Sequence, residues 1–247
     1  MIAAARTGGE TLSGMRFEAA SHVGRKRKRN EDRYLALRQA DASLLLVVAD
    51  GMGGVPGGEE AASLAIAAYR ESANRETLTQ ARLTQPALDA QQKILRYGKL
   101  FGMDGMGTTL TAALLQKDIL CWVHIGDSRL YRFRAGRLEQ LTRDHRFLDG
   151  MIRDRAITPE EAKYHPLGSL LDQCLGCPDP DPEEGRSELE AGDSVLLCTD
   201  GLSDELDAGA MEMLLANSGD TAAKACALLD AALAAGGRDN ITFILAE

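Results

Sequence analysis

Short apolar runs that stop at an acidic residue constrain this chain more than any other feature of its sequence. Residues 44–49 (LLLVVA) and 194–199 (SVLLCT) have the length of strands, and each runs straight into Asp-Gly. Two more acidic residues stand beside short apolar runs, one after Ile125-Gly126 and one just before the last run of the chain. The four strand-end acids are Asp50, Asp127, Asp200 and Asp239.

A carboxylate at the end of a buried strand is held rigidly, and a neighbouring glycine lets a ligand come close. Several such carboxylates would repel one another unless a cation joined them. Hard oxygen ligands select Mg²⁺, Mn²⁺ or Ca²⁺ rather than zinc. Asp-Gly is also a common turn dipeptide, so the residues alone leave a metal site and a set of ordinary turns as open alternatives.

The rest of the pattern predicts an α+β fold of layers with mostly antiparallel sheet, because short Asp- or Gly-containing links join successive strands. Strands are expected at 44–49, 108–115, 119–125, 129–134, 137–141, 194–199 and 241–246, and helices at 58–72, 86–99, 144–165, 208–217 and 221–235. The stretch 177–187 is rich in Pro and acids and predicts a surface loop. Residues 1–14 are expected to be a flexible terminus.

Composition excludes some classes of function. The formal charge of −9 argues against a general nucleic-acid or anionic-membrane binder. No apolar stretch approaches the roughly 18 residues of a membrane span, so we expect no membrane association. The five cysteines have no regular spacing, which predicts reduced thiols in a reducing compartment. The sequence Cys174-Leu175-Gly176-Cys177 is weak support for zinc, because no second such pair accompanies it.

The segment 21–32 (SHVGRKRKRNED) concentrates positive charge. If it is extended, Arg25, Arg27 and Arg29 share one face. The segment then has three interpretations: a solvated basic strand, a weak nucleic-acid patch, or a place where one arginine points inward and clamps a phosphate.

Six motifs in this order resemble the metal-dependent protein phosphatase family (PPM, protein phosphatase 2C-like), particularly its bacterial members. The resemblance covers nearly the whole chain from about residue 16. The motifs are Gly24-Arg25 with Arg27 and Asn30-Glu31-Asp32, Ala49-Asp50-Gly51-Met52-Gly53-Gly54, Gly107-Thr108-Thr109, Gly126-Asp127-Ser128-Arg129, Thr199-Asp200-Gly201-Leu202-Ser203-Asp204, and Gly237-Arg238-Asp239-Asn240-Ile241-Thr242.

The resemblance implies a four-layer αββα sandwich, in which two central antiparallel β-sheets are flanked by helix pairs. It implies one phosphatase domain at 15–247 with a flap at about 144–176. It also implies two core Mn²⁺ or Mg²⁺ ions and a third, weaker one. By motif position, the expected site residues are Asp50 bridging the metals and orienting water, the Gly51 carbonyl, Asp200 and Asp239 as ligands, Glu31 and Asp32 acting directly or through water, Asp127 at the third ion, Arg27 binding phosphate, and Asn240 supporting the ligands.

The implied reaction is hydrolysis of phosphoserine or phosphothreonine in proteins by a two-metal-activated water, reversing a cognate bacterial Ser/Thr kinase. We expect a cytoplasmic monomer that acts on phosphoproteins. The alternatives are a catalytically silent regulatory binding module of the same fold and an enzyme of this fold that acts on another phosphate. The three metal aspartates expected in active members are all present, which disfavours the silent module.

Two departures from the family pattern stand out. Met52 occupies the position where animal relatives carry a histidine, so the proton donor is unassigned. The segment 165–170 (HPLGSL) lacks the Arg-Asn usual in the family. This segment belongs to the expected flap, so the order of the flap and the substrate preference are open. His124 lies near Asp127, but strand alternation predicts that it is a packed strand residue.

Overall fold

Two five-stranded antiparallel sheets stack face to face in the computed structural model, which describes residues 15–247 apart from 53–55, 163–164, 166 and 169. One sheet has the order β1 (Phe17–His22), β10 (Ile241–Ala246), β9 (Ser194–Cys198), β6 (Arg129–Arg134) and β7 (Arg137–Gln140). The other has the order β2 (Arg33–Arg38), β3 (Leu44–Ala49), β4 (Leu110–Gln116), β5 (Ile119–Ile125) and β8 (Glu183–Glu188).

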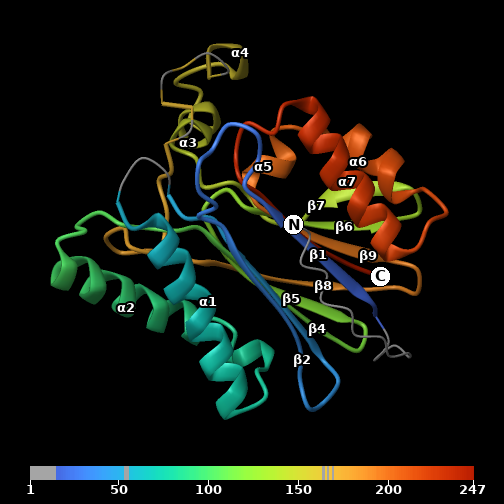
Figure 1. The fold of residues 1–247 in the computed structure, drawn as a ribbon, viewed down its shortest axis with the longest axis horizontal. Coiled ribbons are helices and arrows are strands. Elements are labelled where there is room, and N and C mark those ends of the chain that lie inside the picture. The colour runs from blue at the N-terminus through green and yellow to red at the C-terminus, as the bar shows by residue number, and fades with distance from the viewer. Residues whose placement is uncertain (1–14, 53–55, 163–164, 166, 169) are drawn as a thin grey trace.

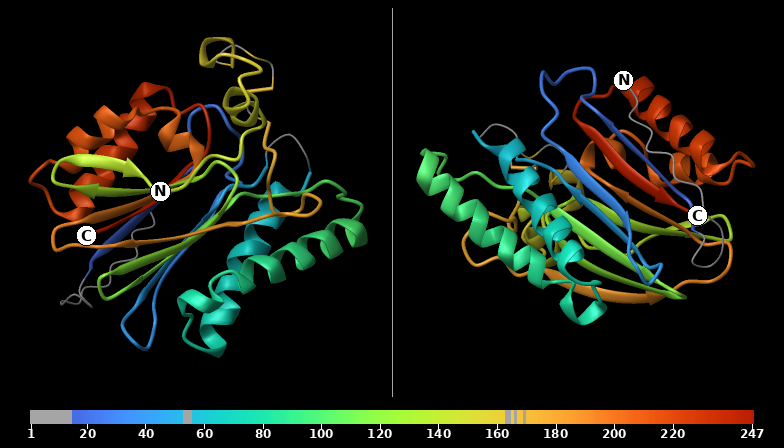
Figure 2. Two further views of the ribbon diagram at one scale, coloured as in Figure 1. Left: turned by 180° about the vertical axis from the view of Figure 1, so that it is seen from behind. Right: turned by 60° about the horizontal axis from the view of Figure 1, so that its bottom comes forward.

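Helix pairs cover the outer faces (Figures 1 and 2). The sheet that contains β3 carries α1 (Gly58–Arg75) and α2 (Gln85–Phe101), joined by the short 3₁₀ helix η1 (Gln80–Arg82). The other sheet carries α6 (Ala208–Leu215) and α7 (Thr221–Ala235). The short helices α3 (Phe147–Arg153), α4 (Pro159–Ala162) and α5 (Asp200–Ser203) lie at one end of the sandwich. This is the expected αββα architecture, and the predicted fold class is confirmed.

The uninterrupted apolar run of β3 follows from burial on both faces. Leu45 and Val47 pack under the helix pair α1 and α2, whereas Leu46 and Val48 pack between the two sheets. A strand covered on both sides has no reason to alternate apolar with polar residues.

Two of the expected secondary-structure assignments are wrong. The region 144–165 is not one helix but the short helices α3 and α4, because Arg155 adopts a left-handed φ of 57° and turns the chain between them. The region 177–187 is not all loop, because β8 begins at Glu183 and pairs with β5 along the sheet edge. Alternate side chains of β8 are exposed to solvent, and edge strands commonly carry charged residues, so the composition of this strand resembles that of a loop.

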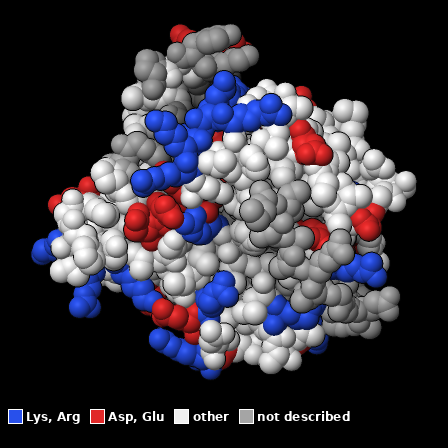
Figure 3. Space-filling model, viewed as in Figure 1, with Lys and Arg blue, Asp and Glu red and all other residues white. Residues whose placement is uncertain are grey.

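The basic segment 21–32 is not extended beyond His22, where β1 ends. Gly24 has a φ of 77°, and the chain turns there, so the predicted alternation of arginine faces is wrong. The five basic residues from Arg25 to Arg29 are all exposed. Figure 3 shows a band of Lys and Arg where Figure 1 places the loop between β1 and β2.

A disulfide joins Cys174 and Cys177, which corrects the prediction that all the thiols are reduced. Their Cα atoms are 5.3 Å apart, within the range that a disulfide bridges, because the chain turns through Gly176. The free cysteines are Cys121, Cys198 and Cys226.

None of the helices in the described parts of the chain combines the length and apolarity that crossing a membrane requires. The expected flexible terminus 1–14 and Gly53-Gly54 of the second motif lie outside the described residues. The flap boundary 144–176 stays a prediction.

Candidate functional site

A pocket of about 390 Å³ opens where the ends of the two sheets meet. The four strand-end aspartates reach it from both sheets: Asp50 follows β3, Asp127 follows β5, Asp200 follows β9 and Asp239 precedes β10. The lining residues are Arg27, Glu31, Asp50, Gly51, Met52, Thr109, Asp127, Leu167, Leu170, Leu171, Asp200, Asp239 and Asn240.

The main chain of Asp50 is held on both sides. Its carbonyl oxygen accepts hydrogen bonds from the Thr109 amide (2.9 Å) and the Thr108 hydroxyl (2.8 Å), and its amide donates to Thr109 Oγ1 (3.0 Å). Gly51 is required beside it, because a Cβ there would lie 2.4 Å from the carbonyl oxygen of Gly58. The glycine after Asp50 is therefore needed for close packing of the main chain, and not only for a turn after β3.

Asp200 and Asp239 lie on neighbouring segments because β9 pairs with β10. A Cβ at Gly201 would lie 1.9 Å from the Asn240 carbonyl oxygen, so glycine lets the two segments approach. Asp239 Oδ1 accepts from the Asn240 amide at 2.7 Å, and its Oδ2 accepts from Arg27 Nη2 at 2.6 Å. Asp200 Oδ1 is buried and has no hydrogen-bond partner among the described residues.

Asn240 anchors the basic loop over the pocket. Its Nδ2 donates to the carbonyl oxygens of Val23 (3.0 Å) and Arg29 (2.8 Å), and its Oδ1 accepts from the Glu31 amide (2.8 Å). These bonds bring Arg27 and Glu31 to the lining of the pocket.

Asp32 lies behind the pocket and is not one of its lining residues. It is 1% exposed, and its Oδ2 accepts from the Thr199 hydroxyl at 2.9 Å. Burial raises its pKa to about 6, against the opposing effect of its hydrogen bonds. Its other carboxylate oxygen has no hydrogen-bond partner within the described chain.

The carboxylates of the pocket resist ionisation together. Burial, and then repulsion from Asp32 and Asp200, raises the pKa of Asp50 well above its ordinary value. Burial, and then the charges of Asp127 and Asp204, raises the pKa of Asp200 to about 8. A cation would relieve both costs, and carboxylate oxygens suit a hard divalent ion. The donor chemistry therefore fits Mg²⁺ or Mn²⁺.

Within the described residues, no three or more His, Cys, Asp or Glu side chains are grouped closely enough to hold a metal ion by themselves. Mg²⁺ usually keeps several waters and takes only one or two protein carboxylates, so an open arrangement of acids is compatible with such an ion.

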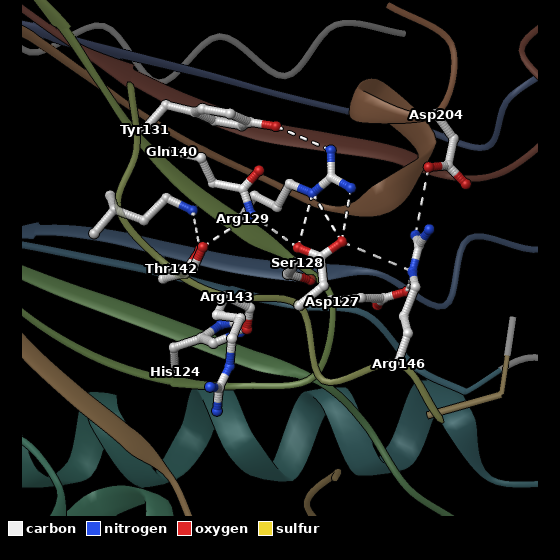
Figure 4. A network of polar contacts seen from close by, with 12 residues as sticks. His124, Asp127, Ser128, Arg129, Tyr131, Gln140, Thr142, Arg143, Arg146 and Asp204 are labelled. Atoms are coloured by element: carbon white, nitrogen blue, oxygen red, sulfur yellow. Dashed lines mark hydrogen bonds and ion pairs between the residues drawn. The ribbon is translucent and has the colours of Figure 1, made fainter. Parts of the chain in front are cut away.

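Asp127 is paired with a residue that sequence reasoning missed. Its Oδ2 accepts from Arg146 Nε at 2.9 Å, and the same guanidinium reaches Asp204 Oδ1 at 3.4 Å (Figure 4). Arg146 precedes α3 by one residue and is distant in sequence from both acids, so no local pattern signals the contact.

His124 is a packed strand residue, as predicted. It is fully buried, with Nδ1 2.9 Å from Thr111 Oγ1 and Nε2 3.0 Å from the Arg143 carbonyl oxygen. Leu167 and Leu170 of the atypical 165–170 segment also line the pocket, and they are 41% and 47% exposed.

Comparison with known proteins identifies the family. Residues 20–235 match the family model described as Protein phosphatase 2C. The serine/threonine phosphatase stp of Listeria welshimeri is 32% identical, and the match covers 94% of this chain and 96% of that protein. The serine/threonine protein phosphatase PstP of Mycobacterium tuberculosis is 39% identical over 94% of this chain, but this chain spans only 45% of its length.

Solved structures agree with these matches. The S. agalactiae serine/threonine phosphatase superposes with a TM-score of 0.88 at 28% identity, covering 94% of this chain and 98% of that one. The catalytic domain of PstP in complex with two manganese ions superposes with a TM-score of 0.83 at 36% identity, covering 94% and 97%. With its αββα sandwich and its acidic pocket between the sheets, this chain belongs to the protein phosphatase 2C family.

Proposed function

We propose that this chain is a metal-dependent protein phosphatase that hydrolyses phosphoserine and phosphothreonine in proteins and reverses a cognate bacterial Ser/Thr kinase. The observation that carries the proposal is the convergence of Asp50, Asp200 and Asp239 on one pocket with Arg27 at its lining. It is supported by relatives named Ser/Thr phosphatases that match along 94% of the chain, one of them with two manganese ions in its structure.

Two core ions, Mn²⁺ or Mg²⁺, would be held by Asp50 between them, with the Gly51 carbonyl, Asp200 and Asp239 as further ligands. Asp32 would act through water, since it lies behind the pocket, whereas Glu31, which lines the pocket, would act directly or through water. When bound, the ions supply Lewis acidity that lowers the pKa of a water to near neutral and offsets phosphate charge.

The residues of the chain supply position and charge. Arg27 is 46% exposed and gives Asp239 one of its guanidinium nitrogens, so its other N–H donors are available to phosphate oxygens. Thr108 and Thr109 fix the main chain of Asp50, and its carboxylate would orient the attacking water in line with the phosphorus. Arg27 then offsets the charge that spreads over the equatorial oxygens.

A covalent intermediate on sulfur is not needed. Cys121 and Cys198 are buried thiols, and burial raises the pKa of Cys198 to about 12, which keeps it protonated and unreactive. We therefore propose direct attack by water. We propose, as the family resemblance implies, that the reaction takes place in the cytoplasm and that the catalyst is a monomer.

The test is release of phosphate from a phosphothreonine peptide with and without Mn²⁺. Asp239→Asn is compared with Asp230→Asn, a control on the exposed face of α7. We expect metal-dependent hydrolysis that EDTA abolishes, that Asp239→Asn reduces by orders of magnitude and that Asp230→Asn preserves, with both variants folded by circular dichroism. Metal binding without turnover would favour the silent binding module. Turnover indifferent to EDTA and to Asp239→Asn would refute the metal assignment.

A further inference from the structure

We propose that Arg146 is a built-in cation: its guanidinium fills a third divalent-cation site made by Asp127 and Asp204, so the native chain binds one ion fewer than its carboxylates could hold. The inference rests on the proposed function only in placing the core ions in the pocket that Asp127 also lines.

The contacts of Arg146 show where its charge is used. Nε donates to Asp127 Oδ2 at 2.9 Å, and Nη2 lies 3.4 Å from Asp204 Oδ1 (Figure 4). Asp144 Oδ2 is more distant from Nε, at 3.8 Å. Asp127 is only 5% exposed, so water contributes little to stabilising its charge. In the described part of the chain, Arg146 is the one cation that forms an ion pair with Asp127.

Asp144 does not depend on Arg146. Arg129 binds it through Nε (2.9 and 3.1 Å) and Nη2 (2.7 Å), and Gln140 Nε2 donates to it at 2.9 Å. The charge of Arg146 is therefore used mainly by Asp127, which lines the pocket, and by Asp204, whose side chain is half exposed.

Asp127 and Asp204 lie near Asp200, whose Oδ1 has no hydrogen-bond partner among the described residues. Asp204 follows Asp200 by one helical turn, and its amide donates to the Asp200 carbonyl oxygen at 2.7 Å. Asp127 and Asp200 line the same pocket, and Oδ1 of Asp200 is buried without a hydrogen-bond partner among the described residues. Carboxylate oxygens of this kind, completed by water, are what Mg²⁺ and Mn²⁺ bind.

Removing the guanidinium would leave a nearly buried carboxylate without a counter-charge, which is costly, and a divalent ion is the simplest replacement. An arginine differs from an ion in one useful respect, because it cannot dissociate. Arg146 stands at the start of α3, and the next residue, Phe147, donates its amide to the Leu170 carbonyl oxygen at 2.8 Å. The ion pair between Arg146 and Asp204 thus links the start of α3 to the end of α5 at any metal concentration. Arg146 therefore acts as a positioning residue.

The experiment counts Mn²⁺ bound per chain at saturation, by equilibrium dialysis, for the wild type and Arg146→Ala. The matched control is Arg143→Ala, since Arg143 is exposed on the same segment and points away from the network in Figure 4. We expect Arg146→Ala to bind one more Mn²⁺ than the wild type and Arg143→Ala to bind the same number. Arg146→Gln, which keeps most of the side-chain volume, should behave like Arg146→Ala and serves if the alanine variant does not fold.

The extra ion should disappear when Asp127→Asn is added to Arg146→Ala, and anomalous diffraction at the manganese edge should place it between Asp127 and Asp204. Equal or lower stoichiometry in folded Arg146→Ala and Arg146→Gln would overturn the proposal. A wild type that binds no Mn²⁺ would instead defeat the proposed function, while the difference between variant and wild type would still decide the role of Arg146.

Discussion

Asn240 shows how one side chain can hold a site together. Its amide group joins the last strand to the basic loop through three hydrogen bonds, to Val23, Arg29 and Glu31, although more than 200 residues of sequence separate the two segments. Arg27 and Glu31 keep their places at the pocket because of these bonds. The family motif singles out Asn240, but only the contacts explain its role.

Asn240→Ala should therefore destabilise the fold and impair the reaction together. Loss of three hydrogen bonds at a site that is 6% exposed should lower the free energy of unfolding by about 2–4 kcal/mol. Urea unfolding and peptide hydrolysis measure the two effects. Asn217→Ala, at an exposed position after α6, is the control and should change neither. Full activity of Asn240→Ala would show that the loop does not need this anchor.

His124 gives a pH dependence with a definite sign. Burial, and then the neighbouring His145, lowers its pKa from 6.5 to about 3. Below pH 6.5 the unfolded chain gains a proton that the folded chain does not, so His124 should reduce the free energy of unfolding by about 1.4 kcal/mol per pH unit until about pH 3. The contribution is fully present above pH 6.5.

The comparison is urea unfolding of the wild type and His124→Gln at pH 7, 6 and 5. The wild type should lose stability more steeply with acid than the variant, because all other titrating groups are common to both. Parallel pH profiles would mean that His124 titrates normally.

At the scale of elements, two glycines on short helices differ in whether the surrounding structure leaves room for a side chain. Gly201 in α5 has the Asn240 carbonyl oxygen 1.9 Å from where a Cβ would stand, whereas a Cβ at Gly209 in α6 would meet only Asp207 Oδ1 at 3.5 Å. The first glycine lets two segments pack closely, and the second only weakens its helix.

Gly201→Ala should lower the free energy of unfolding by about 1–3 kcal/mol and separate Asp200 from Asp239, which should also weaken Mn²⁺ binding. Gly209→Ala should raise stability by about 0.5–1 kcal/mol, because alanine favours the helix. Thermal unfolding and Mn²⁺ titration of both variants check this pair. Equal effects at the two positions would contradict the packing argument.

At the scale of the whole molecule, the pocket joins two layers. Asp50 and Asp127 belong to the sheet that contains β3, while Asp200 and Asp239 adjoin strands of the other sheet. Apolar contacts fill the space between the sheets, but at this end the carboxylates repel one another. A bound cation would convert that repulsion into a link between the sheets.

Mn²⁺ should thus raise the thermal midpoint, by about 5–10 °C if it reaches 100 times its dissociation constant, and EDTA should reverse the shift. Protons compete with the ion for Asp200, whose pKa is about 8, so the shift should shrink as the pH falls below that value. Differential scanning calorimetry of the wild type and Asp50→Asn at pH 8 and pH 6 measures it. A shift that Asp50→Asn retains would place the ion elsewhere.

Local pattern predicted most of the elements, because burial on both faces makes strands such as β3 and β10 continuously apolar and because caps and glycines end α7 where expected. The edge strand β8 escaped prediction, since an edge strand with solvated acids resembles a loop. The disulfide between Cys174 and Cys177 also escaped, because the backbone turn that brings the two cysteines together does not show in composition.

By itself the sequence determined where the acids stand along the strands, and its motifs determined the family. Only the tertiary structure decided which acids share a pocket, that Asp32 lies behind it, and that Asp127 is already paired with Arg146. The physical reason is the range of the forces involved. Periodicity and turn chemistry act between near neighbours in the chain, whereas an ion pair or a shared pocket depends on segments that meet only when the two sheets pack.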